Sequence, residues 1–346
     1  MKKMKALVLK GIRDMELEEV PIPQPEPDEI LIKVKAAAIC HTDFAAIDGE
    51  HSMISYPCVP GHEFSGTVEK TGDAVRHIKE GDRATALGYS YCGVCKNCRR
   101  GLHTGCEKMA AIPFHYDGAF AEYVKVPAIS VYRIPGDMSF EDAAMAEPAA
   151  NGLSAIDKAS IYPGENVLVV GPGPIGLFAA QFASQMLPDR LIVSGTRDER
   201  LNTALELGAT DTINIRKVDA GKEVDRITGG KGIDAMFYCG GGQEVWDLAE
   251  QKLTMYGRFI LEAVPPKVRS RFNVSPFAFL EKQMTYTGVS GYSAAQFLSA
   301  LEMINKGQIK TGPIITHRFS LDDYMKAFET AENRLEGAIK VVINEF

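Results

Sequence analysis

Hydrophobic residues over roughly the first 150 positions come in short runs that alternate with polar ones. A representative stretch runs from Ile30 to Ala36, and Pro- and Gly-rich turns such as 21–27 interrupt the runs. Alternation with a period of two is typical of strands that bury one face. The pattern predicts a mainly β domain over residues 1–150.

The pattern changes at Val167, where continuous apolar runs begin to alternate with helical segments. Buried strands are predicted at 167–170 and 191–194 and helices at 174–186 and 198–207, with further strands near 212–214, 233–238 and 256–261. Such alternation is typical of a parallel sheet with crossover helices. It predicts an α/β, doubly wound domain over residues 151–290. Two amphipathic helices at 294–306 and 321–330 and a closing strand near 339–343 are expected in the last segment, residues 291–346.

The composition restricts the classes of function. A chain of 346 residues exceeds the ~250–300 at which single cores stop growing, so two domains are expected. The net charge of −7 and the lack of a basic run argue against nucleic acid as a partner. No segment reaches the ~18 apolar residues of a membrane span, and the N-terminus lacks the apolar stretch of a signal peptide. A cytoplasmic protein without membrane contact is expected.

Four of the seven cysteines fall in one short segment, Cys92-x2-Cys95-x2-Cys98-x7-Cys106. Cytosolic thiols stay reduced, so clustered cysteines indicate a metal or catalysis. Four thiolates complete a tetrahedral zinc shell with no position left for water, which predicts a structural zinc. An iron–sulfur cluster or a redox thiol pair could use the same ligands.

A glycine-rich turn directly follows the predicted strand at 167–170. Its residues are Gly171, Gly173, Pro174, Ile175 and Gly176, and they open the next predicted helix. Glycines at this spacing permit a tight turn, a close approach of the backbone to a pyrophosphate, and close packing of the helix, whose N-terminus favours anions. The context predicts a dinucleotide site, the alternative being a turn without a ligand.

The end of the second strand of this domain lacks the acid that usually binds the ribose of NAD. Gly195 stands there, followed by Thr196, Arg197 and, in the next helix, Arg200. A small residue with a hydroxyl and cationic groups beside it suits a 2′-phosphate, which predicts a preference for NADP(H). In the alternative, both arginines face solvent and the enzyme uses NAD(H) or either cofactor.

Mixed sulfur, nitrogen and oxygen ligands occur in distant parts of the first 150 residues. Cys40 and His62 are expected to hold a catalytic zinc, with Glu63 or Glu147 as the third ligand and water or a substrate oxygen as the fourth. Each residue alone could equally belong to a core or a turn.

These motifs together resemble the zinc-containing medium-chain alcohol dehydrogenases, and within them the polyol and threonine dehydrogenases. The resemblance spans essentially the whole chain. It is carried by Cys40 to Asp43, Gly61-His62-Glu63 with Gly66, Gly81-Asp82-Arg83, the four cysteines, Gly118 to Val124, Glu147-Pro148 and Gly171 to Gly176. It implies a GroES-like catalytic domain to which residues 291–346 return, an inserted Rossmann domain, one catalytic and one structural zinc per subunit, and homodimers or homotetramers. Glu147 stands where the simple alcohol dehydrogenases have a cysteine, and in this the chain resembles the polyol branch. Gly195-Thr196-Arg197 is similar to the Gly-Ser-Arg that ends the second strand in an NADP-dependent secondary-alcohol branch.

The resemblance also implies roles for individual residues. The reaction would be a hydride transfer between an alcohol and a nicotinamide, with Thr42 taking the hydroxyl proton and Glu63 supporting the metal. Asp43 would hold the second ring nitrogen of His62. His41 would lie near the cofactor pyrophosphate, or else be an exposed loop histidine.

Two features leave alternatives open. Many relatives have a relay histidine where this chain has Ala45, so the proton could leave through water, His41 or His51. The substrate would be a polyol, sugar alcohol or secondary alcohol. Threonine-type or sugar-phosphate chemistry with NAD remains the alternative, the latter because Lys267, Arg269 and Arg271 could form a cationic rim, although solvated surface charge explains them as well.

Two rival classes keep part of these features. One is a relative with the same fold that binds a dinucleotide without alcohol chemistry, and the other is a structural or interaction module that binds metal. The first would lack the zinc ligands, all of which are present here.

Overall fold

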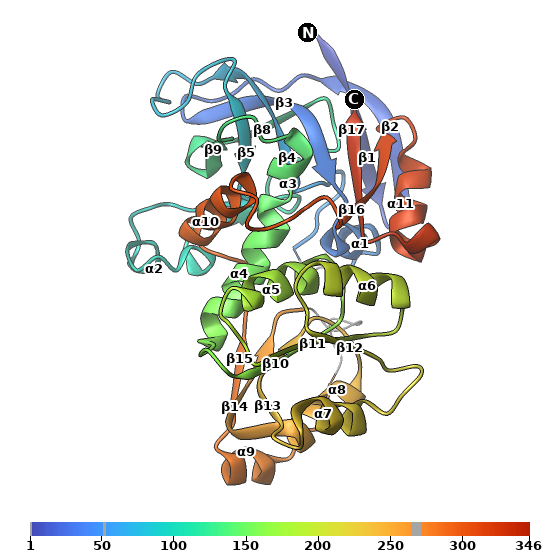
Figure 1. The fold of residues 1–346 in the computed structure, drawn as a ribbon. Coiled ribbons are helices and arrows are strands. Elements are labelled where there is room, and N and C mark those ends of the chain that lie inside the picture. Colours follow the sequence, from blue (N-terminus) through green and yellow to red (C-terminus); the bar gives the residue numbers. More distant parts are fainter. Residues whose placement is uncertain (1, 51–52, 264–270) are drawn as a thin grey trace. The chain divides into compact units, whose positions relative to one another are not determined.

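The computed structural model describes residues 2–50, 53–263 and 271–346 (Figure 1). Contacts divide the chain into two compact units. Unit 1 comprises Met1–Glu147 and Ser293–Phe346, and unit 2 comprises Pro148–Tyr292. No helix within the described ranges is both long enough and apolar enough to cross a bilayer.

Unit 1 is built on a mainly antiparallel sheet with the strand order β16-β17-β3-β4-β5-β9, in which β8 also pairs with β3. The strands are β3 (Glu29–Ala38), β4 (Glu63–Thr71), β5 (Arg83–Ala86), β8 (Tyr123–Pro127), β9 (Val131–Arg133), β16 (Ile315–Ser320) and β17 (Lys340–Glu345). Smaller pairs are β1 (Lys3–Gly11) with β2 (Asp14–Pro21), and β6 (Tyr89–Ser90) with β7 (Ala110–Ala111). Ile30, Ile32 and Val34 of β3 bury against the same core as Phe64 and Phe120, as the period-two pattern requires.

Short helices connect these strands. They are α1 (His41–Ile47), α2 (Lys96–Arg99), α3 (Phe140–Ala144), α10 (Ala294–Asn305), α11 (Tyr324–Asn333), and the 3₁₀ turns η1 (His103–Gly105), η2 (Ala128–Ser130) and η3 (Leu335–Gly337). The boundary between the units falls in the first turn of α4 (Ala146–Ala159).

The last strand of the chain enters the sheet formed by the first part of unit 1. Strand β17 is parallel to β16 and antiparallel to β3, where Val342 and Ile343 face Ala38 and Ala37 (Figure 1, red beside blue). Ala38 also pairs with Glu63 at the start of β4. The register therefore brings residue 340, Glu63 and the segment after β3 into one region.

Unit 2 is a parallel sheet with the order β12-β11-β10-β13-β14-β15. Its strands are β10 (Asn166–Val170), β11 (Arg190–Gly195), β12 (Asp211–Asn214), β13 (Ile233–Tyr238), β14 (Leu253–Leu261) and β15 (Thr285–Gly288). Its helices are α5 (Pro174–Ser184), α6 (Asp198–Glu206), α7 (Ala220–Thr228), α8 (Gln243–Lys252) and α9 (Pro276–Lys282). The doubly wound α/β prediction is confirmed for this unit.

The direction of strand progression reverses between β10 and β13, which are neighbours in the sheet. Ligands of open α/β sheets bind at the carboxyl ends of the strands at such a reversal. Gly171 follows β10 at this point, and Cys239 follows β13. The glycine-rich turn thus lies where the topology favours a ligand.

Candidate metal centres and dinucleotide site

Three of the four proposed catalytic zinc ligands come together in unit 1. Ligand atoms of Cys40, His62 and Glu63 all lie within 4.8 Å of one another. Cys40 is half-buried at the N-cap of α1, directly after β3, and His62 and Glu63 are buried at the start of β4. Glu147, buried in the first turn of α4, is not a member of this group among the described residues. The set offers one soft and two harder ligands, a combination suited to zinc.

Asp43 joins the two segments that carry these ligands. Its fully buried carboxylate accepts hydrogen bonds from the Cys40 backbone amide (2.8 Å) and from the Gly61 amide (3.1 Å). Oδ1 also lies 3.7 Å from Nδ1 of His62, which is an ion-pair distance but too long for a hydrogen bond. Nδ1 of His62 makes no hydrogen bond within the described structure. Because Nδ1 faces Asp43, Nε2 is the nitrogen left for a ligand.

The electrostatics of this group favour a cation. Burial by itself would lower the pKa of His62, but the thiolate of Cys40 and the carboxylate of Asp43 raise it well above its ordinary value. The negative groups that favour a protonated imidazole would also favour a bound metal cation, which competes with protons for the same ligands. The residues present therefore fit a zinc ion.

Lys340 is a member of this site that the sequence analysis missed. It is 3% exposed, and its Nζ donates to both carboxylate oxygens of Glu63 (2.8 and 2.6 Å) and to the Ile39 carbonyl (3.2 Å). Desolvation opposes its charge, but Glu63, Cys40 and Glu147 together raise its pKa. The available signal was a single lysine within the otherwise apolar run at 338–343, a position where a charged side chain needs a buried partner.

The other residues expected near the metal lie on α1. Thr42 is half-buried, with its hydroxyl 3.8 Å from the Sγ of Cys40, whereas His41 is exposed. His51 lies outside the described residues. Thr42 is therefore placed beside the thiol of Cys40. His41 is exposed, as one of its two interpretations expected, and its place near the pyrophosphate stays a prediction.

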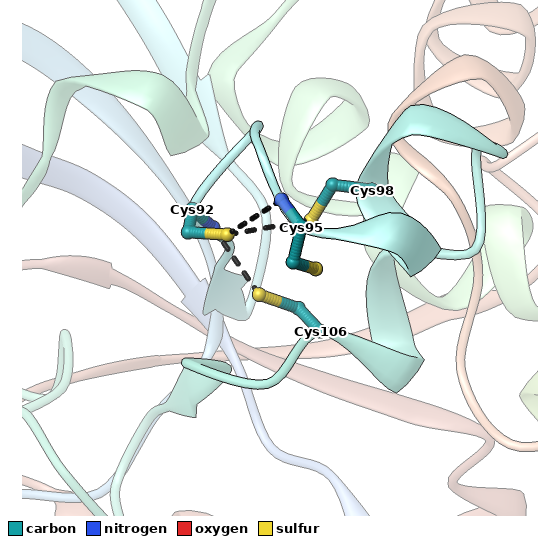
Figure 2. A group of neighbouring side chains, drawn as sticks. All are labelled: Cys92, Cys95, Cys98 and Cys106. Carbon is teal, nitrogen blue, oxygen red and sulfur yellow. Dashed lines mark hydrogen bonds between the residues drawn. The ribbon is translucent and has the colours of Figure 1, made fainter.

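The four cysteines of the second candidate site converge in a loop of unit 1 (Figure 2). Their sulfurs lie within 4.8 Å of one another, and those of Cys92 and Cys98 are 3.9 Å apart. Four Zn–S bonds of about 2.3 Å in a tetrahedron place sulfurs about 3.8 Å apart. All four thiols are free. The geometry fits a closed, structural zinc.

Backbone amides point at these sulfurs. The amide of Cys92 donates to Cys106 (3.3 Å), and the amide of Cys95 donates to Cys92 (3.4 Å). Amides of Cys98 and Glu107 lower the pKa of Cys95 to about 6. Amide donors of this kind stabilise thiolates, which are the metal-binding form.

The glycine-rich turn of unit 2 is shaped by close backbone approaches. Gly171 has φ +103°, and a Cβ there would lie 2.8 Å from the Cys239 carbonyl oxygen. A Cβ at Gly176 would collide with the Gly171 carbonyl. At Gly173, the N-cap of α5, a Cβ would meet no atom within 4 Å, and no side chain caps the helix. Pro174 stands at the first position of the helix and is followed by Ile175, so the N-terminus of α5 carries uncapped amides of the kind that favour a pyrophosphate.

The end of β11 has the composition expected for a phosphate site. Gly195 is buried, and Thr196 and Arg197 are half-buried. The guanidinium of Arg197 has neither a hydrogen bond nor an ion pair with any described residue, whereas Arg200 is buried on α6 with 9% exposure. The alternative in which Arg197 and Arg200 both face solvent is therefore wrong for Arg200, which is buried.

Asp198, the first acid after Gly195 in the sequence, already has hydrogen-bond partners. Asp198 accepts from Asn214 Nδ2 (2.7 Å) and Lys217 Nζ (2.6 Å), and these contacts lower its pKa. It is therefore held away from the role of ribose acceptor.

Comparison with known proteins agrees with both units. Residues 26–136 match the alcohol dehydrogenase GroES-like domain, and residues 174–306 match the zinc-binding dehydrogenase domain. The chain is 34% identical over 332 residues to L-threonine 3-dehydrogenase of Bacillus velezensis, covering 94% of this chain and 95% of the relative. It is 30% identical over 346 residues to sorbitol dehydrogenase of Bacillus subtilis, covering 98% and 97%.

A solved structure is similar along the whole chain. A candidate zinc-binding dehydrogenase from Sinorhizobium meliloti, bound to NADP, has a TM-score of 0.92 and 30% identity, covering 99% of this chain and 100% of that one. The domain matches and the full-length relatives show that this chain belongs to the zinc-containing medium-chain alcohol dehydrogenase family.

Proposed function

We propose that this oxidoreductase transfers a hydride between NADP and an alcohol, namely a polyol, a sugar alcohol or a secondary alcohol. The observation that carries the proposal is the group formed by Cys40, His62 and Glu63 beside the half-buried hydroxyl of Thr42. A fold-retaining relative without alcohol chemistry would have no need of these ligands.

Cys40, His62 and Glu63 would hold the catalytic zinc, with Glu147 as the second carboxylate of the region. A zinc ion bound there supplies Lewis acidity to an alcohol or carbonyl oxygen. Asp43 orients the cysteine and histidine segments through its two amide hydrogen bonds. Lys340 holds Glu63 and offsets part of the negative charge of the ligand set.

Thr42 would accept the proton of the substrate hydroxyl. Its hydroxyl lies 3.8 Å from the Sγ of Cys40, one of the proposed zinc ligands. Alanine at position 45 supplies no onward acceptor, so water or the exposed His41 would carry the proton to solvent. A nicotinamide dinucleotide bound at the glycine-rich turn supplies the hydride acceptor.

The preference for NADP rests on charge and space at the end of β11. Gly195 provides no acid for the ribose, Asp198 is engaged by Lys217, and Arg197 has a guanidinium without a partner in the described structure. An unpaired guanidinium suits a phosphate dianion through two parallel hydrogen bonds. The similar Sinorhizobium meliloti protein was solved with NADP, which supports the same assignment.

L-threonine is the second candidate substrate. The relative from Bacillus velezensis, 34% identical, is an L-threonine 3-dehydrogenase. The sugar-phosphate alternative rested on three cationic residues, of which Lys267 and Arg269 lie outside the described residues and Arg271 is exposed.

A homodimer or homotetramer fits the surface of unit 2. Strand β15 is the last in its sheet order, so its outer edge has no partner strand in the described part of the chain. Large apolar side chains are exposed nearby in sequence, at Phe277 (67%) and Leu280 (75%) of α9. Unpaired edges and exposed apolar groups favour association between copies. Light scattering should give a mass of two or four chains, and a monomer at micromolar concentration would contradict this assembly.

We also propose a cytosolic location, because clustered thiols that hold a metal are typical of a reducing compartment. The net charge of −7 argues against a nucleic-acid partner, and we propose no membrane partner.

Steady-state kinetics with NADP and NAD, against polyols, amino alcohols, sugar phosphates and secondary alcohols, test the proposal. Turnover should require zinc, and a chelator that empties the open site should abolish it reversibly. Thr42→Val should lower kcat roughly 10²–10⁴-fold and change its pH profile, while Thr42→Ser should retain most of the rate. Turnover that survives complete zinc removal would refute the metal-dependent reaction, and a higher kcat/KM with NAD would refute the NADP preference.

A further inference from the structure

We infer that Pro172 is a cofactor-specificity residue, whose ring occupies the space that an acidic side chain at position 195 would need. The inference rests on the proposed dinucleotide function. It adds a residue of the glycine-rich turn, otherwise associated only with the pyrophosphate, to the choice between NADP and NAD.

The geometry at the end of β11 carries this inference. A Cβ built on Gly195 would lie 2.6 Å from Cδ and 2.7 Å from Cγ of Pro172, and 3.4 Å from Leu201 Cδ2. Carbon atoms in contact normally stay 3.5–4.0 Å apart. Even alanine at position 195 therefore requires a neighbour to move, and aspartate or glutamate requires more.

Pro172 is poorly able to move. Its ring closes on its own backbone and fixes its φ. A change of ring pucker moves Cγ but leaves Cδ, which is bonded to the backbone nitrogen, almost in place, so the shorter of the two contacts persists. The preceding residue, Gly171, donates its amide to the Ser194 carbonyl (2.9 Å), and a Cβ there would already be too close to the Cys239 carbonyl. Pro172 is itself buried. The turn is thus fixed against both neighbouring strands.

Position 195 is fixed as well. The carbonyl of Gly195 accepts from the Ile215 amide (3.0 Å), and strand β11 pairs with β10 and β12. Because neither backbone can retreat, Pro172 and Gly195 form a matched pair. The chain therefore lacks an acid at this strand end, and Pro172 would also prevent one from being placed there to bind the ribose of NAD.

The pair predicts strongly non-additive substitutions. Gly195→Asp alone introduces the acid but cannot place it, so binding of both dinucleotides should fall at least tenfold. Pro172→Ala alone opens the space without supplying an acid. Together they should place a carboxylate for the ribose hydroxyls and repel the 2′-phosphate, changing the ratio of the NAD and NADP dissociation constants at least a hundredfold in favour of NAD.

The test measures dissociation constants of NADP and NAD by calorimetry on the full-length wild type, the two single variants and the double variant, without alcohol substrate. Thermal unfolding is recorded for Gly195→Ala alone and for the double variant Pro172→Ala/Gly195→Ala. Alanine adds the Cβ but no charge, so this comparison measures the steric clash by itself. Gly195→Ala should lower the Tm by roughly 2–12 °C when Pro172 is intact and change it little when Pro172→Ala is also present.

The outcomes are distinguishable. If Gly195→Asp alone binds NAD as tightly as the double variant, or if Gly195→Ala leaves the Tm unchanged, Pro172 does not restrict position 195 and the inference fails. If the wild-type protein binds neither dinucleotide, the proposed function itself fails. A wild type that binds both, together with the non-additive pattern, supports the inference.

Discussion

Lys340→Met removes one charge of a buried ion pair at the candidate catalytic site. The side chains of Lys340 and Glu63 are 4% and 1% exposed, and Nζ donates to both carboxylate oxygens. Methionine has a similar length but cannot donate. The substitution therefore leaves a carboxylate buried without its cation and the Ile39 carbonyl without one of its donors.

Breaking a buried pair by removing one partner costs about 3–5 kcal/mol of stability. For a domain of 150–250 residues, which includes the size of unit 1, each kcal/mol shifts the Tm by about 2–4 °C. We therefore expect the Tm of the metal-free protein to fall by roughly 6–20 °C. A zinc ion beside Glu63 would replace the lost positive charge, so the metal-bound protein should lose less.

If Lys340→Met loses less stability with zinc bound than without it, the difference in free energy equals the gain in zinc affinity of the variant. If zinc restores only about 1.4 kcal/mol, its dissociation constant falls tenfold. Thermal unfolding with and without zinc, together with competition against a chromophoric chelator, measures both quantities. The charge-free double variant Lys340→Met/Glu63→Gln should recover most of the stability, because replacing both partners of a buried pair is often nearly neutral, but it should show no gain in affinity.

A matched control removes an exposed lysine from an ion pair on a helix. Lys306 and Glu302 are 3.5 Å apart with 60% and 63% exposed side chains. Lys306→Met should change the stability by no more than about 0.5 kcal/mol. If Lys340→Met behaves like Lys306→Met in the metal-free protein, or if its zinc affinity is unchanged, Lys340 does not hold Glu63 in the way described.

Three further predictions concern other parts of the two sites. Gly173→Ala should lower the Tm by only about 2–4 °C, since alanine is a poorer N-cap than glycine. It should weaken dinucleotide binding at least tenfold, because its Cβ enters open space where a phosphate would approach. Gly312→Ala, which also adds a Cβ in open space, should leave binding unchanged, and equal affinities in the two variants would argue against a phosphate at the turn. Asp43→Ala should destabilise unit 1 by about 2–6 kcal/mol, since one buried and one half-buried amide lose their acceptor. A protein that keeps its zinc and its Tm would rule out the role of Asp43 in holding the two segments together. Cys106→Ser should halve the bound zinc from two ions to one per chain by elemental analysis, and an unchanged zinc content, or iron with sulfide, would contradict a structural zinc in that loop.

Local sequence was sufficient for the features whose parts are close along the chain. The apolar runs predicted β10 and β11, and the structure contains strands at Asn166–Val170 and Arg190–Gly195. The helix predicted at 174–186 begins at Pro174 and ends slightly earlier, at Ser184. The four cysteines converge because a segment of fifteen residues can bring them together only within a small volume. Short-range periodicity and spacing limit the possible conformations strongly enough for such conclusions.

Tertiary structure alone decided which distant side chains meet. Lys340 contacts Glu63 across 277 residues because β17 pairs with β3 and β3 pairs with β4, a register that no local pattern encodes. The same sheet groups Glu63 rather than Glu147 with Cys40 and His62. The contact between Pro172 and Gly195 likewise depends on the packing of two parallel strands. Side-chain periodicity shows which face of a strand is buried but not which strand lies beside it, so these charges and contacts follow only from the folded sheet.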